Sequence, residues 1–472
     1  MSTETPTRQR VSKRRRRSVD ELAVDVQTVD RNEVSARSGR RLALRRRGHR
    51  HPGSNRPDAI TSRRSMAPPG HKSGNFVGLF VLTIILNVVG LVMVLSASTI
   101  TGLETTGSTW YFFQRQLIWA ALGLIAMVAL MRTDYRRLRQ HAQLALIVMG
   151  VALMFVLLPG IGVGAHGSTR WLGTATVSVQ PAEFAKVAVA LFCAAWLADR
   201  ADVFADTRVT LRPVLLICGF VALLVLLQRS QGTAMIIVAI AFVMLFASGV
   251  PFLPLARIGL ALATLATVLA LTQGYRRARV TAFLDPWADP LDSGYQTIQS
   301  LVGVASGGVT GVGLGAGRAK WGFLPFAHTD FIFAVIAEEL GLIGSVFVLL
   351  AFVGIVFFGW RTALAAPDRF GMLLAIGITT WIAVQAFINI AVVLGVVPIS
   401  GVPLPFVSIG GSSLVATMMA MGIVLNIARQ PHHALQPHNA LQPHNALQPH
   451  NALQPHNARQ PHNARQQHDP LQ

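Results

Sequence analysis

Long uncharged apolar stretches recur along this 472-residue chain, and they limit its fold more than any other feature. A membrane-spanning α-helix needs about twenty consecutive apolar residues, and most of these stretches are near that length. Hydrophobic residues make up 52 % of the chain, too high a share for an ordinary soluble protein of several domains. The sequence therefore predicts an all-α integral membrane protein of about ten transmembrane helices, near 76–98, 116–131, 142–159, 181–198, 212–228, 232–249, 252–273, 331–358, 371–394 and 410–427.

Two polar tails flank the predicted membrane domain, 75–428. Residues 1–74 hold 19 Lys and Arg against 7 Asp and Glu and few large apolar residues, which predicts a disordered tail that faces anionic membrane lipids. DNA binding is the minor alternative, and we expect no nucleic-acid partner. Residues 429–472 repeat the unit ALQPHN, whose regular prolines prevent a continuous helix, so disorder is predicted here as well.

The Lys and Arg residues of the short loops predict the orientation of the helices. Most of them fall on the same side as the two tails, and cytoplasmic loops carry the excess of positive charge, so both termini are predicted to be cytoplasmic. This topology places one large loop, 274–330, outside the cytoplasm between the seventh and eighth predicted helices.

A few ionisable residues interrupt the apolar stretches or lie at their ends. Glu183 and Lys186 are three positions apart on one predicted helix and can form a pair, either within a polar cavity or as a packing salt bridge. His328 and Asp330 come at the start of the eighth predicted helix, and Glu338 follows about two turns later. No second His or Cys lies near His328 at ligand spacing, so no zinc site is predicted.

The large loop combines acids with basic residues. FLDPWADPLDSGYQ, 283–296, contains Asp285, Asp289 and Asp292. Carboxylates of this kind can take a proton from a sugar hydroxyl, and basic residues can bind phosphates. The sequence therefore favours a lipid-linked sugar diphosphate as substrate, although a transporter with a polar cavity explains the same residues nearly as well. The basic residues of the loop are Arg276, Arg277, Arg279, Arg318 and Lys320.

A set of motifs in order along 76–427 resembles the SEDS family of peptidoglycan polymerases, and its division branch more than its elongation branch. The motifs are GLVMVLSAS (90–98), FFQRQLIW (112–119), GSTRWL (167–172), VQPAEFAK (179–186), FLDPWADPLDSGYQ (283–296), GVGLGAGRAKWGFLPFAHTDFIFAVIAEELG (311–341) and GVPLPFVSIGGSSL (401–414).

This resemblance implies an inverting transfer that polymerises lipid II outside the bacterial cytoplasmic membrane, at the division septum, with release of undecaprenyl diphosphate. It also implies a class B penicillin-binding protein and other division proteins as partners. Asp289 matches the essential aspartate of the family, whereas Asp285 and Asp292 stand where other members have Asn and often Gly. The substrate-binding candidates are Arg170, Arg276, Arg277, Arg279, Lys320, His328 and Asp330, and the cavity candidates are Glu183, Lys186, Glu338 and Ser412.

Some positions depart from the family pattern. RSQGT (229–233), LPFAH (324–328) and VSIGGSS (407–413) replace PDLGT, LPEAH and ISYGGSS. A divalent cation is possible, but the sequence contains no dedicated site for one and predicts no certain cofactor. Two further functions stay open at this point: a lipid II flippase, and a non-catalytic scaffold for division proteins.

Overall fold

The computed structural model describes residues 73–160, 162–165, 168–174, 178–200, 207–272 and 274–430. The two predicted tails lie outside the described residues, apart from the two positions of each that adjoin the membrane domain. The helices, in chain order, are α1 (Gly74–Thr106), α2 (Tyr111–Arg132), α3 (Arg136–Leu157), α4 (Pro181–Ala198), α5 (Thr207–Leu227), α6 (Gln231–Ala247), α7 (Phe252–Thr272), α8 (Gly274–Leu284), α9 (Tyr295–Ser306), α10 (Ile332–Leu364), α11 (Arg369–Val393) and α12 (Gly411–Arg429).

The predicted membrane-spanning character is confirmed by the long helices. Among the described residues, α1, α2, α3, α4, α10, α11 and α12 are long and apolar enough to cross a membrane. Three shorter apolar helices, Leu211–Leu227, Gln231–Ala247 and Phe252–Val268, occupy the positions of the fifth, sixth and seventh predicted spans. The chain is therefore a mostly helical, multi-pass membrane protein.

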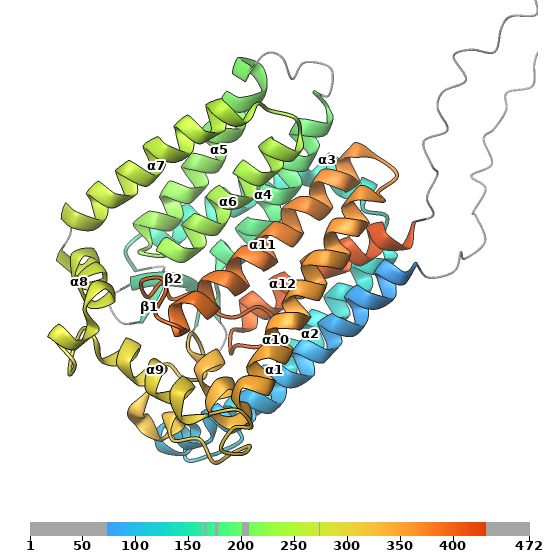
Figure 1. Cartoon of the computed structure of the whole chain (residues 1–472). Helices are drawn as coiled ribbons and strands as arrows, with labels where there is room; N and C mark the ends of the chain where they lie inside the picture. Colours follow the sequence, from blue (N-terminus) through green and yellow to red (C-terminus); the bar gives the residue numbers. More distant parts are fainter. Residues whose placement is uncertain are drawn as a thin grey trace, which may run out of the picture. The chain divides into compact units, whose positions relative to one another are not determined.

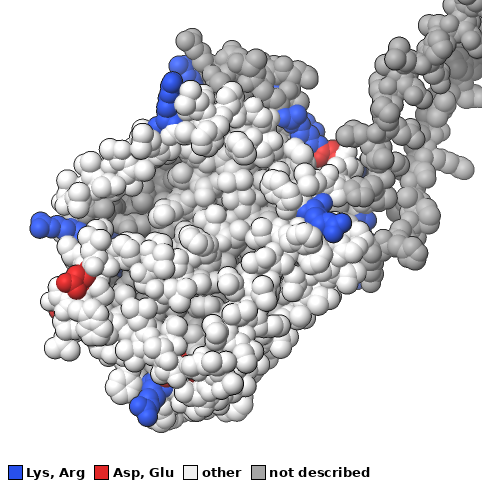
Figure 2. Space-filling view, viewed as in Figure 1, with Lys and Arg blue, Asp and Glu red and all other residues white. Residues whose placement is uncertain are grey.

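The helices divide into a buried centre and an outer layer. Nearly all side chains of α4 and α12, and most of those of α11, are buried, whereas few of those of α2 and α3 are. Figure 2 shows a broad uncharged middle, with Lys and Arg toward the ends of the helices. Apolar side chains exposed on this scale are unfavourable in water and suit the hydrocarbon of a bilayer. Those of the outer layer include Leu117, Ile118, Ile125, Leu144 and Ile147.

A small antiparallel sheet, which the sequence analysis did not predict, connects α3 to α4. Its strands β1 (Gly162–Ala165), β2 (Ser168–Gly173) and β3 (Ser178–Val179) pair in the order β1-β2-β3. Leu172 of β2 lies opposite Gly162 on one side and Val179 on the other. The sheet lies at the same end of the helices as α8 and α9 (Figure 1).

The segment 274–330, predicted as one large loop, contains α8 and α9 and two short helical turns, η2 (Pro286–Ala288) and η3 (Ala319–Phe323). Its glycine-rich part packs on a break in α10. The break lies at Gly341, whose φ of 66° is a left-handed conformation that favours glycine. Backbone groups of the loop replace the interrupted helical bonds, since Val312 N donates to Glu338 O and Leu342 N to Gly308 O, both at 3.0 Å.

Candidate active site

Asp289 lies in a tight turn between α8 and α9. Its Oδ2 accepts hydrogen bonds from the backbone N–H of Ser293 at 3.1 Å and from the Ser293 hydroxyl at 3.0 Å. Its carbonyl accepts a bond from Gly294 N at 2.9 Å, which closes the turn. Only glycine fits at 294, because a Cβ there would lie 1.9 Å from the carbonyl oxygen of Pro286. The turn thus fixes the backbone of Asp289 while its side chain is exposed.

The hydrogen bonds from Ser293 determine the charge of Asp289. The backbone N–H of Ser293, and then its hydroxyl, hold the pKa of the Asp289 carboxyl below its usual value. Asp289 is therefore an ionised carboxylate at neutral pH.

The two neighbouring acids have local roles in the turn. Asp285 caps η2 by accepting a hydrogen bond from Trp287 N at 3.1 Å. Asp292 is exposed, and its carbonyl accepts a bond from Tyr295 N at 3.2 Å. Asp292 is thus a turn residue and Asp285 a capping residue. Whether Asp285 also approaches the substrate stays a prediction.

A second group of charged residues lies around Asp330, just before α10. Burial raises the pKa of Asp330 to about 6, and the nearby guanidinium charges of Arg170 and Arg279 act in the opposite direction. Arg170 comes from β2 and Arg279 from α8, so three segments that are distant in sequence converge here. Together, the two arginines and one acid form a cationic group that can bind an anion.

Backbone carbonyls position these two arginines. Arg170 donates to the carbonyls of Gln228 at 3.2 Å and of Arg229 at 2.7 Å, at the turn between α5 and α6. Arg279 donates to the carbonyl of Ile399 at 3.0 Å, in the segment between α11 and α12. Backbone carbonyls thus fix both guanidinium groups beside the Asp330 carboxyl.

His328 lies close to this group and is uncharged. Burial lowers the pKa of His328, so its imidazole is neutral at pH 7. Its ring centroid is 5.4 Å from that of Phe112, and its carbonyl accepts a bond from Ile409 N at 3.1 Å. His328 thus joins α2 to the segment before α12 and carries no positive charge for a phosphate.

Lys320 has a different role from the predicted one. Its side chain is only 7 % exposed, and its ammonium group lies 3.4 Å from Glu339 Oε1 and donates to the carbonyl of Gly315. Both carboxylate oxygens of Glu339 also accept from the Ser96 hydroxyl at 2.7 Å. Lys320 is therefore part of a buried network that holds the loop to α1 and α10, and a phosphate cannot reach it in this arrangement.

The remaining loop candidates differ in exposure and position. Glu338 accepts bonds from the backbone N–H groups of Arg318 at 2.7 Å and Ala319 at 3.1 Å, so it anchors the loop to α10. Arg277 is exposed on α8, the helix that precedes the Asp289 turn. Arg276 lies on the same helix, and its side chain is outside the described residues.

The predicted pair of α4 is formed within the helical centre. Lys186 Nζ lies 2.8 Å from Glu183 Oε2, and both side chains are almost fully buried. Gln385 of α11 accepts a further bond from Lys186 at 2.6 Å, and the ammonium lies 4.6 Å from the ring centroid of Trp381. Ser412 is also buried and accepts a bond from Gln180 N at 3.0 Å, at the start of α4.

Sequence reasoning missed three polar residues that complete these networks: the buried Gln385 and Asn389, and the partly buried Ser96. Asn389 donates to the carbonyls of Asp330 at 2.7 Å and Val402 at 2.8 Å, and so fixes the backbone at the cationic group. Gln385 and Asn389 stand four positions apart in the apolar stretch 371–394. A polar pair at helical spacing in a membrane span was the signal that could have revealed them.

No group of three or more His, Cys, Asp or Glu side chains is arranged to hold a metal ion within the described part of the chain. The participation of a divalent cation stays a prediction.

Comparison with known proteins identifies relatives over the whole membrane domain. Residues 77–433 match the profile of the FtsW/RodA/SpoVE family, described as a cell cycle protein. Stage V sporulation protein E of Bacillus subtilis (strain 168) is 40 % identical over 351 residues, which cover 74 % of this chain and 96 % of that protein. A probable peptidoglycan glycosyltransferase FtsW of Geobacter metallireducens is 40 % identical over 352 residues, 74 % of this chain and 93 % of the relative.

A solved structure extends this similarity to three dimensions. It concerns a peptidoglycan synthase complex with structural coordination of polymerization and crosslinking. One chain of it is 31 % identical to this chain, with a TM-score of 0.63, over 75 % of this chain and 97 % of that chain.

Proposed function

The chain belongs to the FtsW/RodA/SpoVE family and is a peptidoglycan glycosyltransferase, and we propose that it polymerises lipid II with Asp289 as the catalytic base. The observation that carries the proposal is the ionised, exposed Asp289 carboxylate in its closed turn. A general base must be unprotonated and able to reach a substrate hydroxyl, and both conditions are met.

In the proposed reaction, Asp289 accepts the proton of the 4-hydroxyl of GlcNAc in an incoming lipid II. The hydroxyl oxygen forms a bond to C1 of the MurNAc at the reducing end of the growing strand. The bond from C1 to the diphosphate oxygen breaks, and undecaprenyl diphosphate leaves. One bond forms and one breaks on opposite faces of C1, so the configuration inverts.

The leaving diphosphate needs positive charge as the C1–O bond breaks. Arg170 and Arg279 support this role, because backbone carbonyls fix their two guanidinium groups beside the single carboxyl of Asp330. Arg277, exposed on α8, and Arg276 are the further candidates. Lys320 is not included in this proposal for the diphosphate, since its ammonium group pairs with Glu339.

The location and partners of the enzyme follow from the same proposal. We place the Asp289 turn outside the cytoplasmic membrane of a bacterium, where polymerisation at the division septum requires it, and both termini inside. A transpeptidase, a class B penicillin-binding protein, is the proposed partner, because a similar chain belongs to a complex that coordinates polymerization and crosslinking. Other division proteins are expected to join this complex.

A polymerisation assay tests the role of Asp289. Purified full-length protein, with its transpeptidase, is given labelled lipid II, and the glycan strands are separated by length. Asp289→Asn should slow polymerisation at least about 100-fold, the lower end of what a general base contributes. Asp292→Asn is the matched control, because Asp292 is exposed in the same turn, and it should retain activity.

Two outcomes would contradict the proposal. Normal polymerisation by Asp289→Asn would exclude it as the base. A wild-type protein that moves labelled lipid II across vesicles without making polymer would favour the flippase function instead. Equal thermal stability of the two variants must accompany either result, so that loss of folding is not mistaken for loss of chemistry.

A further inference from the structure

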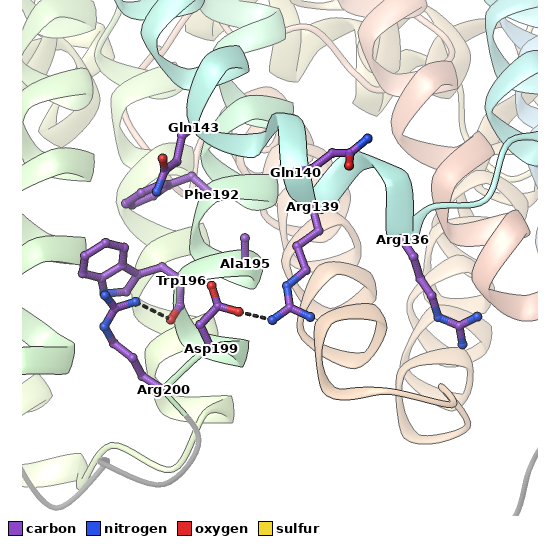
Figure 3. A pocket seen from close by; sticks show the side chains of 9 residues that line it. All are labelled: Arg136, Arg139, Gln140, Gln143, Phe192, Ala195, Trp196, Asp199 and Arg200. Atoms are coloured by element: carbon purple, nitrogen blue, oxygen red, sulfur yellow. Dashed lines mark hydrogen bonds and ion pairs between the residues drawn. The ribbon is translucent and has the colours of Figure 1, made fainter. Parts of the chain in front are cut away.

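A cavity of about 530 Å³ opens between α3 and α4, at the opposite end of the helices from α8, α9 and the sheet (Figures 1 and 3). The end of α12 lies at this end too, since Tyr135 N, just before α3, donates to Asn426 Oδ1 at 3.3 Å. The start of α1 adjoins it, because the Ser73 hydroxyl donates to the Ala428 carbonyl at 2.8 Å. The site of glycosyl transfer therefore does not include the cavity. Its polar lining residues are Arg136, Arg139, Gln140, Gln143, Asp199 and Arg200.

The lining carries an excess of positive charge. Three arginines line it against one acid, Asp199, which pairs with Arg139. Arg136 forms an ion pair with a second acid, Asp368, which lies outside the cavity, at 2.9 Å. Asp134 is a further acid outside the cavity whose charge acts on Arg136. The lining itself has three guanidinium groups and one carboxylate, and two glutamine amides add neutral donors. The cavity is suited to an anion with several oxygen acceptors.

Arg200 is held in position for such an anion. Its guanidinium lies 3.4 Å above the centre of the Trp196 ring and donates to the Trp196 carbonyl at 3.3 Å. In the same wall, the indole N–H of Trp196 has no hydrogen-bond partner among the residues that the structure describes. Because this N–H is itself inaccessible to solvent, it adds no donor to the cavity, and Arg200 supplies the positive charge of this wall.

An apolar stripe continues from the cavity along the outer face of α3. Leu144, Ile147 and Val151 follow Gln140 at helical spacing, and their side chains are 46–63 % exposed. These residues face outward in a helix that crosses the membrane, so the medium around them is hydrocarbon. The cationic cavity and the stripe together match a molecule with an anionic head and an apolar chain.

We propose that this cavity binds the phosphate headgroup of an anionic phospholipid, with an acyl chain along the stripe of Leu144, Ile147 and Val151. Arginine is suited to this because its planar guanidinium donates two parallel bonds to phosphate oxygens. Basic cavities between transmembrane helices near the membrane surface bind such headgroups. A soluble phosphate would use the arginines but not the stripe, and an acidic protein segment would not need a membrane-embedded face.

Native mass spectrometry of the full-length protein tests the proposal. The protein is taken from nanodiscs of dioleoyl phosphatidylglycerol and dioleoyl phosphatidylcholine, which share acyl chains but differ in charge, and the retained lipids are counted. One phosphatidylglycerol should be retained in preference to phosphatidylcholine. Arg139→Gln and Arg200→Gln should each weaken this binding about fivefold, the contribution of one basic residue at an anionic membrane surface.

Arg361→Gln is the matched control. Arg361 is also exposed near a helix end and lies over an aromatic ring, 5.6 Å from the centre of Phe357, but it does not line the cavity. This variant should retain phosphatidylglycerol as the wild type does. Thermal midpoints in phosphatidylcholine alone must be equal for all variants, which shows that they fold.

Four results would overturn the proposal. The first is equal retention of the two lipids by the wild type. The second is an equal loss in Arg361→Gln and Arg200→Gln, which would indicate a general charge effect. The third is displacement of phosphatidylglycerol by millimolar glycerol 3-phosphate, since a soluble phosphate would then bind without the apolar stripe. Full retention in the Arg139→Gln/Arg200→Gln double variant would equally exclude the cavity.

Discussion

Replacement of Asp330 by Asn should stabilise the protein above pH 6, because the folded structure holds this carboxyl where ionisation is unfavourable. Burial raises its pKa from 3.8 to about 6, even though Arg170 and Arg279 oppose the effect. Asn is nearly the same size and keeps the backbone carbonyl that accepts the bond from Asn389. The substitution therefore removes the charge and changes little else.

The pH range of the effect follows from the two pKa values. Below about pH 4, Asp330 is protonated in both the folded and the unfolded chain, and its ionisation costs nothing. Between about pH 4 and pH 6 the unfolded chain releases the proton while the folded chain keeps it, so the folded state loses stability as the pH rises. The shift from 3.8 to about 6 corresponds to about 3 kcal/mol, fully present above pH 7.

The assay is the thermal midpoint of unfolding in detergent, measured from pH 4 to pH 8 for wild type and Asp330→Asn. The difference in midpoint should grow from pH 4 to about pH 6.5 and stay constant above. Asp289→Asn is the control, because the pKa of Asp289 is lowered and its titration lies below this range. Parallel curves for wild type and Asp330→Asn would refute the reasoning. If Asp330 acts at the diphosphate, the stabilised variant should also lose activity.

Two further predictions concern the other polar networks. Lys186→Met should destabilise the protein by about 3–5 kcal/mol, because it leaves Glu183 buried without its partner. The double variant Lys186→Met/Glu183→Gln should recover most of this loss, as measured by an unfolding titration. A double variant no more stable than the single one would show that the two residues are not coupled. Ser293→Ala removes one bond to Asp289 and should move the acidic limb of the polymerisation pH profile to higher pH, whereas Ser293→Thr should not. An unchanged limb in Ser293→Ala would contradict Asp289 as the titrating base.

The sequence was sufficient to locate the long helices, because a bilayer imposes both the length and the composition of a spanning segment. The ends of these helices were less predictable. The first predicted span ends at 98, but α1 continues to Thr106 through polar residues. Hydropathy detects where the hydrocarbon ends, whereas the backbone hydrogen bonds of a helix continue beyond it.

The candidate site was predictable where partners are close in sequence. Glu183 and Lys186 are one helical turn apart, and their pairing follows from that spacing. The contact of Lys320 was not predicted, because its partner, Glu339, lies 19 residues away in another element. The convergence of Arg170, Arg279 and Asp330 is a property of the tertiary fold, and no local pattern encodes it.

The opposite environments of Asp289 and Asp330 give the two acids different chemical roles. Hydrogen bonds keep Asp289 ionised at neutral pH, so its carboxylate is available to accept a proton, and the same bonds lower its basicity. Asp330 has a pKa of about 6 beside two arginines, so its charge is close to the point of change at neutral pH. A bound diphosphate would raise that pKa further, because a nearby negative charge disfavours ionisation. Under the proposed function, diphosphate binding and proton uptake by Asp330 are therefore coupled. When Asp330 is protonated, it no longer offsets the positive charges of the two arginines that face the anion. When the anion leaves, Asp330 releases the proton again.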